Sequence, residues 1–468
     1  MRLAYFSPLP PARSGIADYS HELLPYLARY AEIDLFVDDV YAPAKEISKR
    51  FPTHSYRDYG SLRQTEGYEA TIYHIGNAVR YHEHIYHTAL KYPGIVVLHE
   101  HMLQHLVQGM TLARGNPEGY IEEMRYCYGR TGERLARLRI DTGRGVDVWS
   151  WPLFERIVDA SLGVVVHSEY ARQQVLTRRP QPHVAKINSH CPENILSGQY
   201  ESPLAAREAL GLPQDAFIVA SFGLITRQKR VGVTLRAFAR FRRRFSDAQF
   251  LLVGAVDPDY DLQSVLDGGI EEGVTVTRRV NLDSFLRYMI ASDLAVNLRY
   301  PTAGETSATL IRLLGFGKPV IVSNVGSFVE YPDDCCAKVD VDETEEDMLL
   351  ATMRALATDE DLRRQMGANA RRYIQTHHTL ERSAQGYIGF IQDILASPPR
   401  PSAVIPSKVR PIGDNVLAGL ISDISAEMVG LGVRERDEAI LREIATAMVE
   451  LDIDSPQVRT ESEKKRAE

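Results

Sequence analysis

The stretch LAVNLRYPTAGETSATLIRLLGFGKPVIV, residues 294–322, decides the fold class of this chain. It starts with an apolar run at 294–298, passes through a Pro/Gly loop into a helix-period segment at 307–316, and returns to an apolar run at 319–322. Continuous apolar runs are typical of strands buried on both faces, and strands that alternate with helices lie parallel. The stretch therefore predicts one strand–helix–strand unit of a doubly wound parallel α/β sheet.

The same alternation of strands and helices extends in both directions from this stretch. It stops near residues 192–202 and restarts, which divides the chain into two sets of elements. The predicted strands are 1–6, 34–37, 70–74, 95–98 and 163–166 in the first set, and 217–222, 249–253, 274–277, 294–298, 319–322 and 337–339 in the second. Open α/β sheets bind ligands at the carboxyl ends of their strands. We therefore expect two Rossmann-like halves that face each other across a cleft.

This division predicts the organisation of the whole chain. Residues 1–195 form an N-terminal Rossmann-like domain, 205–378 form a second one, and a helix at 379–396 crosses back to the first. The segment 397–411 contains five prolines and is predicted to be an extended linker. Residues 412–468 show two amphipathic stretches that predict a helical hairpin. The hairpin either packs on the main body or mediates self-association.

Composition excludes several classes of protein. The chain has 468 residues, 44% of them hydrophobic, and a net charge of −8, whereas proteins that bind nucleic acid are usually basic. Four cysteines without metal-binding spacing exclude a disulfide framework. No apolar run reaches the roughly 18–20 residues of a membrane-spanning helix. We expect a cytoplasmic, reduced, multi-domain protein, with peripheral attachment to the inner face of a membrane as an alternative.

The loop at residues 302–307 places a carboxylate beside a predicted helix N-terminus. Glu305 lies between Gly304 and the pair Thr306 and Ser307, which the spacing places in the first helical turn. Backbone N–H groups there have no partner inside the helix and bind phosphate oxygens. Glu305 can accept hydrogen bonds from ligand hydroxyls, or it only caps the helix. A polyhydroxylated group attached to a diphosphate, as in a nucleotide sugar, matches this arrangement.

A second loop in the same half is rich in positive charge. Gly223 ends a strand-like run, and Arg227, Lys229 and Arg230 follow before a helix that begins near Val231. Side-chain cations combined with helix N-terminal amides suit a diphosphate group. The alternative is a solvated basic loop without a ligand.

The first half offers a loop after its first strand. Residues 8–19 include Arg13, Ser14, Gly15 and Asp18 and lead into a helix. A glycine at this position lets the backbone approach a ligand, and the helix N-terminus faces an anion. The alternative is an ordinary turn in which Ser14 or Asp18 caps the helix.

Polar residues also end two buried strands of the first half. His99 and His101 follow the run 95–98 with a glutamate between them, and Asn77 follows the previous strand. We expect these groups at the same edge of the sheet, where they can serve as hydrogen-bond donors and bases. Structural histidines are one alternative, and a zinc site that includes His105 is another.

In this order, the motifs resemble those of GT-B glycosyltransferases of the family 4 type, which are retaining and nucleotide-sugar dependent. The resemblance covers about residues 1–397 and rests on SGIADYS at 14–20, VVVHSEY at 164–170, GETS at 304–307 and GKPVI at 317–321. It implies the GT-B fold and a UDP- or GDP-linked sugar as donor. It also implies a glycan, lipid-linked or small-molecule acceptor, retention of configuration, and no metal or other cofactor.

The resemblance also implies roles for individual residues. His99 corresponds to an active-site histidine near the donor sugar, Lys229 to the lysine that neutralises the diphosphate, and Glu305 to the carboxylate that touches sugar hydroxyls. These three are the predicted catalytic residues. The predicted donor-binding residues are Gly15, Gly223, Arg227, Lys229, Arg299, Gly304, Glu305, Thr306 and Ser307, and the predicted acceptor-side residues are Arg13, Ser14, Asp18, Asn77 and His101.

Two positions depart from the family pattern. Leu224 stands where many members have an arginine that pairs with the lysine, so Arg227, Arg230 or Arg299 would have to substitute. Arg312 stands where many members have a second glutamate that contacts the ribose. The chain is therefore interpreted as a divergent member with a Gly-Glu-Thr-Ser motif.

Three other functions fit the same two-domain arrangement. A nucleotide-sugar epimerase would consume donor with no acceptor present. A phosphorylase or an enzyme for phosphosugar acceptors would need a cationic pocket in the first domain, for which Arg13 and Arg80 are the candidates. A non-catalytic sugar-nucleotide-binding protein would bind the donor without turnover.

Overall fold

The computed structural model describes two compact units. Its described residues are 1–143, 145–180, 183–267 and 270–397, so most of the predicted linker and the predicted hairpin at 412–468 lie outside them. The larger unit comprises Met1–His101 and Ala160–Pro401 as far as these are described. The smaller unit comprises the helical segment Met102–Asp159. The sequence analysis did not separate this segment from the N-terminal domain.

The first sheet of the larger unit has seven parallel strands in the order β3-β2-β1-β4-β5-β6-β7. Its strands are β1 (Arg2–Phe6), β2 (Glu32–Val37), β3 (Thr53–Ser55), β4 (Ala70–Ile75), β5 (Ile95–Leu98), β6 (Gly163–Val166) and β7 (Val184–Lys186). The five predicted strands are confirmed to within two residues at each end. The sequence did not reveal β3 and β7, because these edge strands have three residues each and no fully buried side chain.

The second sheet has six parallel strands in the order β10-β9-β8-β11-β12-β13. Its strands are β8 (Ile218–Phe222), β9 (Gln249–Val253), β10 (Val274–Arg278), β11 (Leu294–Asn297), β12 (Val320–Ser323) and β13 (Ala337–Val339). All six were predicted. The inner strands β11 and β12 are fully buried, as expected for strands covered by helices on both faces.

Helices cover both sheets. Those around the first sheet are α1 (Gly15–Leu27), α2 (Lys45–Ser48), α3 (Tyr59–Thr65), α4 (Val79–Lys91) and α8 (Glu169–Arg178). Helix α9 (Glu193–Leu196) packs instead in the core of the second half. Those that follow are α10 (Pro203–Leu210), α11 (Val231–Arg242), α12 (Leu262–Leu266), α13 (Leu282–Ala291), α14 (Ala308–Gly315), α15 (Glu345–Thr358), α16 (Glu360–His377) and α17 (Leu380–Ala396). Short 3₁₀ helices are η1 (Tyr56–Asp58), η3 (Arg227–Lys229) and η4 (Gly326–Glu330).

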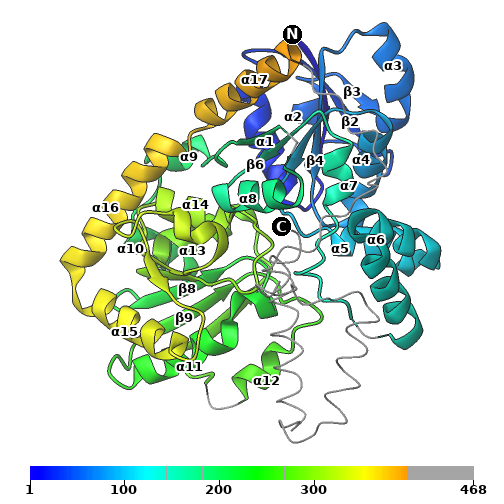
Figure 1. Ribbon diagram of the computed structural model, residues 1–468. Helices are drawn as coiled ribbons and strands as arrows, with labels where there is room; N and C mark the ends of the chain where they lie inside the picture. The colour runs from blue at the N-terminus through cyan, green and yellow to red at the C-terminus, as the bar shows by residue number, and fades with distance from the viewer. Residues whose placement is uncertain (144, 181–182, 268–269, 398–468) are drawn as a thin grey trace, which may run out of the picture. The chain divides into compact units, whose positions relative to one another are not determined.

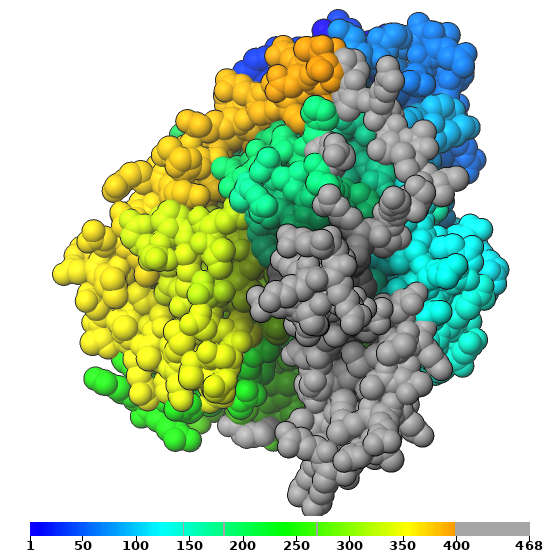
Figure 2. All heavy atoms as spheres, viewed as in Figure 1, coloured from blue at the N-terminus to red at the C-terminus, as the bar shows by residue number. Residues whose placement is uncertain are grey.

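The last two described helices link the two halves of the larger unit. Helix α16 packs on α14 of the second half, and α17 packs on α1 of the first (Figure 1). Tyr19 and Tyr387 join α1 to α17 through a hydroxyl contact of 3.0 Å. Figure 2 shows that the yellow-to-orange surface of α16 and α17 continues to the blue N-terminal surface.

The smaller unit consists of α5 (Gln104–Met110), η2 (Leu112–Arg114), α6 (Pro117–Thr142) and α7 (Glu155–Asp159). Tyr120, Met124 and Trp151 belong to its own apolar core. The side chain of Gln104 crosses that core and donates to the carbonyl of Trp151 at 2.6 Å. Among the described residues, no helix combines the length and apolar character needed to cross a membrane.

Within the larger unit, the carboxyl edges of the two sheets touch each other. The His101 N–H, after β5, donates to the Ala303 carbonyl, after β11, at 2.9 Å. The Thr306 hydroxyl lies 3.3 Å from the carbonyl of His167, which follows β6. Parallel sheets bind ligands at this edge, so the functional site is expected where these loops meet.

Candidate functional site

Lys229 lies at the carboxyl edge of the second sheet. Strand β8 ends at Phe222, and the chain turns at Gly223, whose φ of +89° favours glycine. The chain then returns through η3, so that the Lys229 ammonium donates to the Phe222 carbonyl. A Cβ at Gly223 would lie 2.9 Å from that ammonium, so the glycine makes room for it.

Burial and neighbouring charges control the ionisation of this lysine. Only 9% of Lys229 is exposed. Burial, together with the Arg299 guanidinium, lowers the pKa of Lys229 to about 7, although the Glu305 carboxylate acts in the opposite direction. At neutral pH this lysine is therefore only partly protonated, and a bound anionic ligand would favour its protonated form.

Glu305 is held in place by its own loop. Its carboxylate accepts the Ala303 N–H at 2.8 Å and the Thr302 hydroxyl at 3.0 Å, and it pairs with the Arg299 guanidinium at 2.9 Å. Gly304 has a φ of +71°, and a Cβ there would lie 2.3 Å from the His101 ring. The loop therefore needs glycine at this position to approach the first sheet.

The start of α14 corrects one prediction. We expected Thr306 and Ser307 in the first helical turn, but the helix begins at Ala308. Ser307 is the N-cap, and its hydroxyl accepts the Leu310 N–H at 3.2 Å. The N–H groups of Ala308 and Thr309, which lack partners within the helix, are therefore the first-turn amides. The preference of serine for the cap position was the sequence signal that places the start of the helix after Ser307.

Glu100 is a site residue that the sequence analysis did not select. Its carboxylate accepts the Asn77 N–H at 2.9 Å. Burial, followed by repulsion from the Glu305 carboxylate, raises the pKa of Glu100 to about 7, against the opposing effects of Asn77 and Arg299. The structure thus brings one carboxylate from each sheet into the same electrostatic environment. The available signal was a glutamate close after a buried strand, but the sequence analysis selected the two flanking histidines as site residues instead.

His99 belongs to a buried cluster of aromatic and imidazole rings. Its Nε2 lies 2.9 Å from Nδ1 of His74. The Tyr19 ring lies 5.0 Å from the His99 ring and 5.2 Å from that of His167. Burial lowers the pKa of His99 well below its usual value, with smaller effects from neighbouring histidines such as His167. The cluster therefore consists of neutral imidazoles at physiological pH.

The other histidine at the end of β5 is also neutral. His101 is buried, and burial lowers its pKa to about 3, with a smaller contribution from Arg178. Its ring lies against Gly304 in the loop that carries Glu305. Among the described residues, no group of three or more histidine, cysteine or acidic side chains is placed to hold a metal ion.

The loop after β1 keeps its predicted polar residues near the surface. Ser14 is the N-cap of α1, and its hydroxyl accepts the Ile16 N–H at 3.2 Å. Gly15 is exposed, and a Cβ there would meet no atom within 4 Å. Arg13 and Asp18 are exposed as well. The helix N-terminus therefore opens to solvent, where a ligand can reach the backbone.

The basic loop of the second half separates into residues with different partners. Leu224 is half-exposed, and Arg227 is exposed. Arg230 pairs with Glu345 at the start of α15. Of the three candidate arginines, Arg299 is the one whose charge acts on Lys229.

Arg312 has a different role from the glutamate expected there. It forms an ion pair of 2.8 Å with Glu22 on α1. The second oxygen of Glu22 lies 3.2 Å from Nε2 of His190. The position therefore links the helices of the two sheets.

Comparison with known families identifies the second half of the chain. Residues 204–373 match the family described as glycosyl transferases group 1. The match lies within the second half and covers well under half of the 468 residues. The Lys229 loop, the Glu305 loop and helix α14 all lie inside the matched range. The prediction that the chain is a glycosyltransferase is confirmed.

Solved structures extend the comparison to the whole fold of this glycosyltransferase. Sucrose-phosphate synthase from Thermosynechococcus elongatus aligns over 85% of this chain and 100% of its own, with a TM-score of 0.61 and 16% identity. A glycosyltransferase from Rickettsia africae aligns over 85% and 99%, with a TM-score of 0.59 and 12% identity. HepE from Anabaena, solved with UDP and glucose, aligns over 84% and 100%, with a TM-score of 0.56 and 14% identity.

These similarities confirm the predicted GT-B fold, with parallel sheets of seven and six strands. A search of curated protein sequences found no match to this chain. The roles predicted for single residues stay predictions.

Proposed function

We propose that this chain transfers a sugar from a nucleotide diphosphate sugar to an acceptor hydroxyl, with retention at the anomeric carbon. One observation carries the proposal: Lys229, Arg299 and Glu305 interact at the carboxyl edge of the second sheet, and both Arg299 and Glu305 act on Glu100 of the first. Positive charge suits the diphosphate, and the carboxylates suit sugar hydroxyls. HepE structures with UDP and with UDP-glucose favour UDP as the first nucleotide to test.

The proposed reaction exchanges one bond at the anomeric carbon for another. The acceptor oxygen forms a bond to the anomeric carbon. The bond between that carbon and the diphosphate oxygen breaks, and its electron pair stays on the diphosphate. The acceptor hydroxyl proton passes to the departing diphosphate. Lys229, Arg299 and the first-turn amides of α14 stabilise the growing negative charge, so that we propose no role for a metal ion.

The two carboxylates take different parts in this proposal. Glu305 is fixed by Ala303, Thr302 and Arg299, yet the oxygen that pairs with Arg299 can accept a further hydrogen bond from a donor-sugar hydroxyl. Glu100 is partly protonated at neutral pH, because its pKa is about 7. It can therefore donate or accept a hydrogen bond, which suits the orientation of an acceptor hydroxyl.

A nucleotide panel on the full chain tests the proposal. UDP and GDP are compared with ADP, which has the same diphosphate and a different base, by thermal shift. A ligand at about 100 times its dissociation constant stabilises the folded state by about 2.7 kcal/mol, so we expect a rise of several degrees with UDP or GDP and none with ADP. Nucleotide sugars that contain the nucleotide found to bind are then used as donors in turnover assays.

The turnover assay separates this proposal from the alternatives. Sugar transfer that depends on an added acceptor supports it, and NMR of the product reports the anomeric configuration. A new sugar isomer formed from donor alone would identify an epimerase. Binding with no turnover for any acceptor would identify a non-catalytic binding protein, and either result overturns the proposal.

A further inference from the structure

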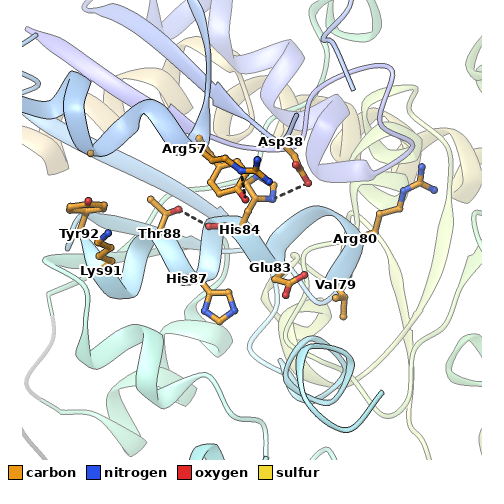
Figure 3. Close-up of a pocket in the computed structure, with 12 residues that line it drawn as sticks. Asp38, Arg57, Val79, Arg80, Glu83, His84, His87, Thr88, Lys91 and Tyr92 are labelled. Atoms are coloured by element: carbon orange, nitrogen blue, oxygen red, sulfur yellow. Dashed lines mark hydrogen bonds and ion pairs between the residues drawn. The ribbon is translucent and has the colours of Figure 1, made fainter. Parts of the chain in front are cut away.

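A groove of about 410 Å³ lies along α4 in the first half of the larger unit. Arg80, His84 and Lys91 line it from α4, while Tyr56 and Arg57 line it from η1 (Figure 3). Its volume lies in the range of small-molecule sites. It lies outside the Lys229–Glu305 cluster, and nothing in the proposed transfer accounts for it.

One end of the groove is at the carboxyl edge of the first sheet, and the other end, at Lys91, precedes β5. Asp38 follows β2 directly, Tyr56 follows β3 directly, and Val79 begins the helix after β4. Since all three strands are parallel, these residues share the carboxyl edge of the sheet. This is the edge at which open α/β sheets bind their ligands.

Both walls of the groove connect to the candidate active site. On one side, Val79 is two residues from Asn77, whose N–H binds the Glu100 carboxylate. On the other side, the segment after Asp38 contacts the loop after β1, because the Leu9 N–H donates to the Tyr41 hydroxyl at 3.0 Å. One end of the groove is therefore close in the chain to the Asn77–Glu100 hydrogen bond.

Side chains of both charges line the groove, since Asp38 and Glu83 lie there with Arg57, Arg80 and Lys91. Among the described residues, Arg80 and Lys91 have no acidic partner. Arg57, in contrast, lies 3.4 Å from Asp39. Asp38 is engaged by His84, with 3.7 Å between Oδ2 and Nδ1.

The two uncompensated cations are far apart. At a rise of about 1.5 Å per residue, the backbones of Arg80 and Lys91 are separated by roughly 16 Å along α4, and Figure 3 shows them at opposite ends of the helix. An extended ligand with more than one anionic position matches this spacing better than a single free anion does.

Aromatic rings add a second element of recognition. The Tyr56 ring lies 4.9 Å from the His84 ring, and Tyr92 lies beside Lys91 at the far end of the groove (Figure 3). Aromatic side chains with a polar tip offer an apolar face and a hydroxyl, which together suit a sugar ring.

We propose that this groove binds an anionic carbohydrate, a sugar that carries phosphate or carboxylate groups, as the part of the acceptor that does not react. Arg80 and Lys91 pair with the anionic groups, and the tyrosine rings lie against the sugar. The role as acceptor rests on the proposed transferase function. Binding in the groove does not depend on it and is measurable without a donor.

Calorimetry on the full chain without donor tests the binding. The probes are glucose 6-phosphate, glucuronate, glucose and inorganic phosphate. The test variant is R80A/K91A, and the matched control is K49A/R50A, which removes one lysine and one arginine from exposed positions outside the groove. We expect at least one charged sugar to bind the wild-type chain and the control equally, and R80A/K91A at least about tenfold more weakly.

The probes identify the anionic group and the source of affinity. Stronger binding of the phosphate sugar or of the uronate decides between phosphate and carboxylate. The proposal is overturned if neither charged sugar binds or if both double variants bind alike. It is also overturned if inorganic phosphate binds as tightly as glucose 6-phosphate, because the sugar would then contribute nothing.

A second measurement keeps this proposal separate from the proposed function. With a productive donor and a charged acceptor, R80A/K91A should raise the acceptor KM at least about tenfold, while hydrolysis of the donor by water stays within twofold of wild type. Loss of charged-sugar binding in R80A/K91A without any glycosyl transfer would preserve the groove and refute the transferase. Glycosyl transfer with an unchanged acceptor KM in R80A/K91A would instead support the transferase and refute the proposal for the groove.

Discussion

The carboxyl edges of the two sheets meet, yet they are built from opposite chemistry. The edge of the first sheet is a buried group of rings in which the imidazoles of His74, His99 and His167 are held neutral by burial. The edge of the second sheet carries Lys229 and Glu305. Arg299 pairs with Glu305 and helps to lower the pKa of Lys229. The comparison indicates that one half supplies neutral hydrogen-bonding groups and the other supplies the charge for a diphosphate.

Removal of the charged half's lysine should have the largest effect. Lys229→Ala is expected to lower turnover by about 10²–10³-fold, because a preorganised charge at the leaving group is lost. The measurement is the steady-state rate with the donor found in the nucleotide panel.

Lys318 provides a matched control for that variant. It is a half-buried lysine that donates to the carbonyls of Ile290 and Ser292 at 2.6 and 2.8 Å, and burial lowers its pKa to about 8. It precedes β12 and so lies at the amino edge of the sheet. Lys318→Ala should lower stability without a comparable loss of turnover per folded molecule. Equal turnover losses in both variants would refute the assignment of Lys229.

The buried histidines of the first half should lower the free energy of unfolding at acidic pH. Burial lowers the pKa of His82 to about 3 and that of His167 to about 4, below the roughly 6.5 of an unfolded histidine. The unfolded state therefore binds more protons below pH 6.5, so the free energy of unfolding is full above that pH and falls as the pH drops. Each residue should cost about 2 kcal/mol at pH 5.

Urea unfolding at pH 7, 6 and 5 measures this effect. His82→Gln should flatten the pH dependence below 6.5, whereas substitution of the exposed His87 by glutamine should leave it unchanged. If the free energy of unfolding is equal at pH 7 and pH 5, these imidazoles are not held neutral and the contrast between the halves fails.

The two halves also differ in how much of each was evident from the sequence. Apolar runs such as those of β5 and β9 located strands to the residue, because burial on both faces requires continuous apolar side chains. The edge strands β3 and β7 are short and half-exposed, so their residues carry no such pattern. The segment Met102–Asp159 was assigned to the N-terminal domain because sequence alone does not show which helices share a core.

The charged site was more predictable than the neutral one. Lys229 and Glu305 lie in short loops directly after strands, so topology alone places them at one edge. The raised pKa of Glu100 depends on Glu305, which is distant in the sequence, and the start of α14 depends on which residue caps it. The first property arises from a contact between loops, which local pattern does not encode, whereas the second rests on the local hydrogen bond between Ser307 and Leu310.

The affinity for UDP should depend on pH through the charged half. Without ligand the pKa of Lys229 is about 7, and a bound diphosphate raises it. Affinity is therefore constant below pH 7 as far as this group is concerned, and it falls by up to about tenfold per unit above pH 7 until the bound-state pKa is passed. Calorimetry in two buffers of different ionisation enthalpy should show proton uptake at pH 8.

Lys229→Arg separates this effect from other titrations. Because arginine stays protonated throughout this range, the variant should bind UDP with no proton uptake at pH 8. Proton uptake that persists in the variant would place the titrating group elsewhere.

The smallest effect is expected where the two halves are tied together by Arg312 and Glu22. Burial alone would raise the pKa of Glu22, but His190 and Arg312 lower it overall, so its pairing is favourable at neutral pH. A double-mutant cycle with Arg312→Leu and Glu22→Gln should give a coupling energy of about 1 kcal/mol from urea unfolding. Since the Arg312 side chain is directed to α1, UDP affinity should change by less than twofold in Arg312→Leu. A loss of about tenfold would instead show that this arginine contacts the nucleotide, and the charged half would then include the position that the family gives to glutamate.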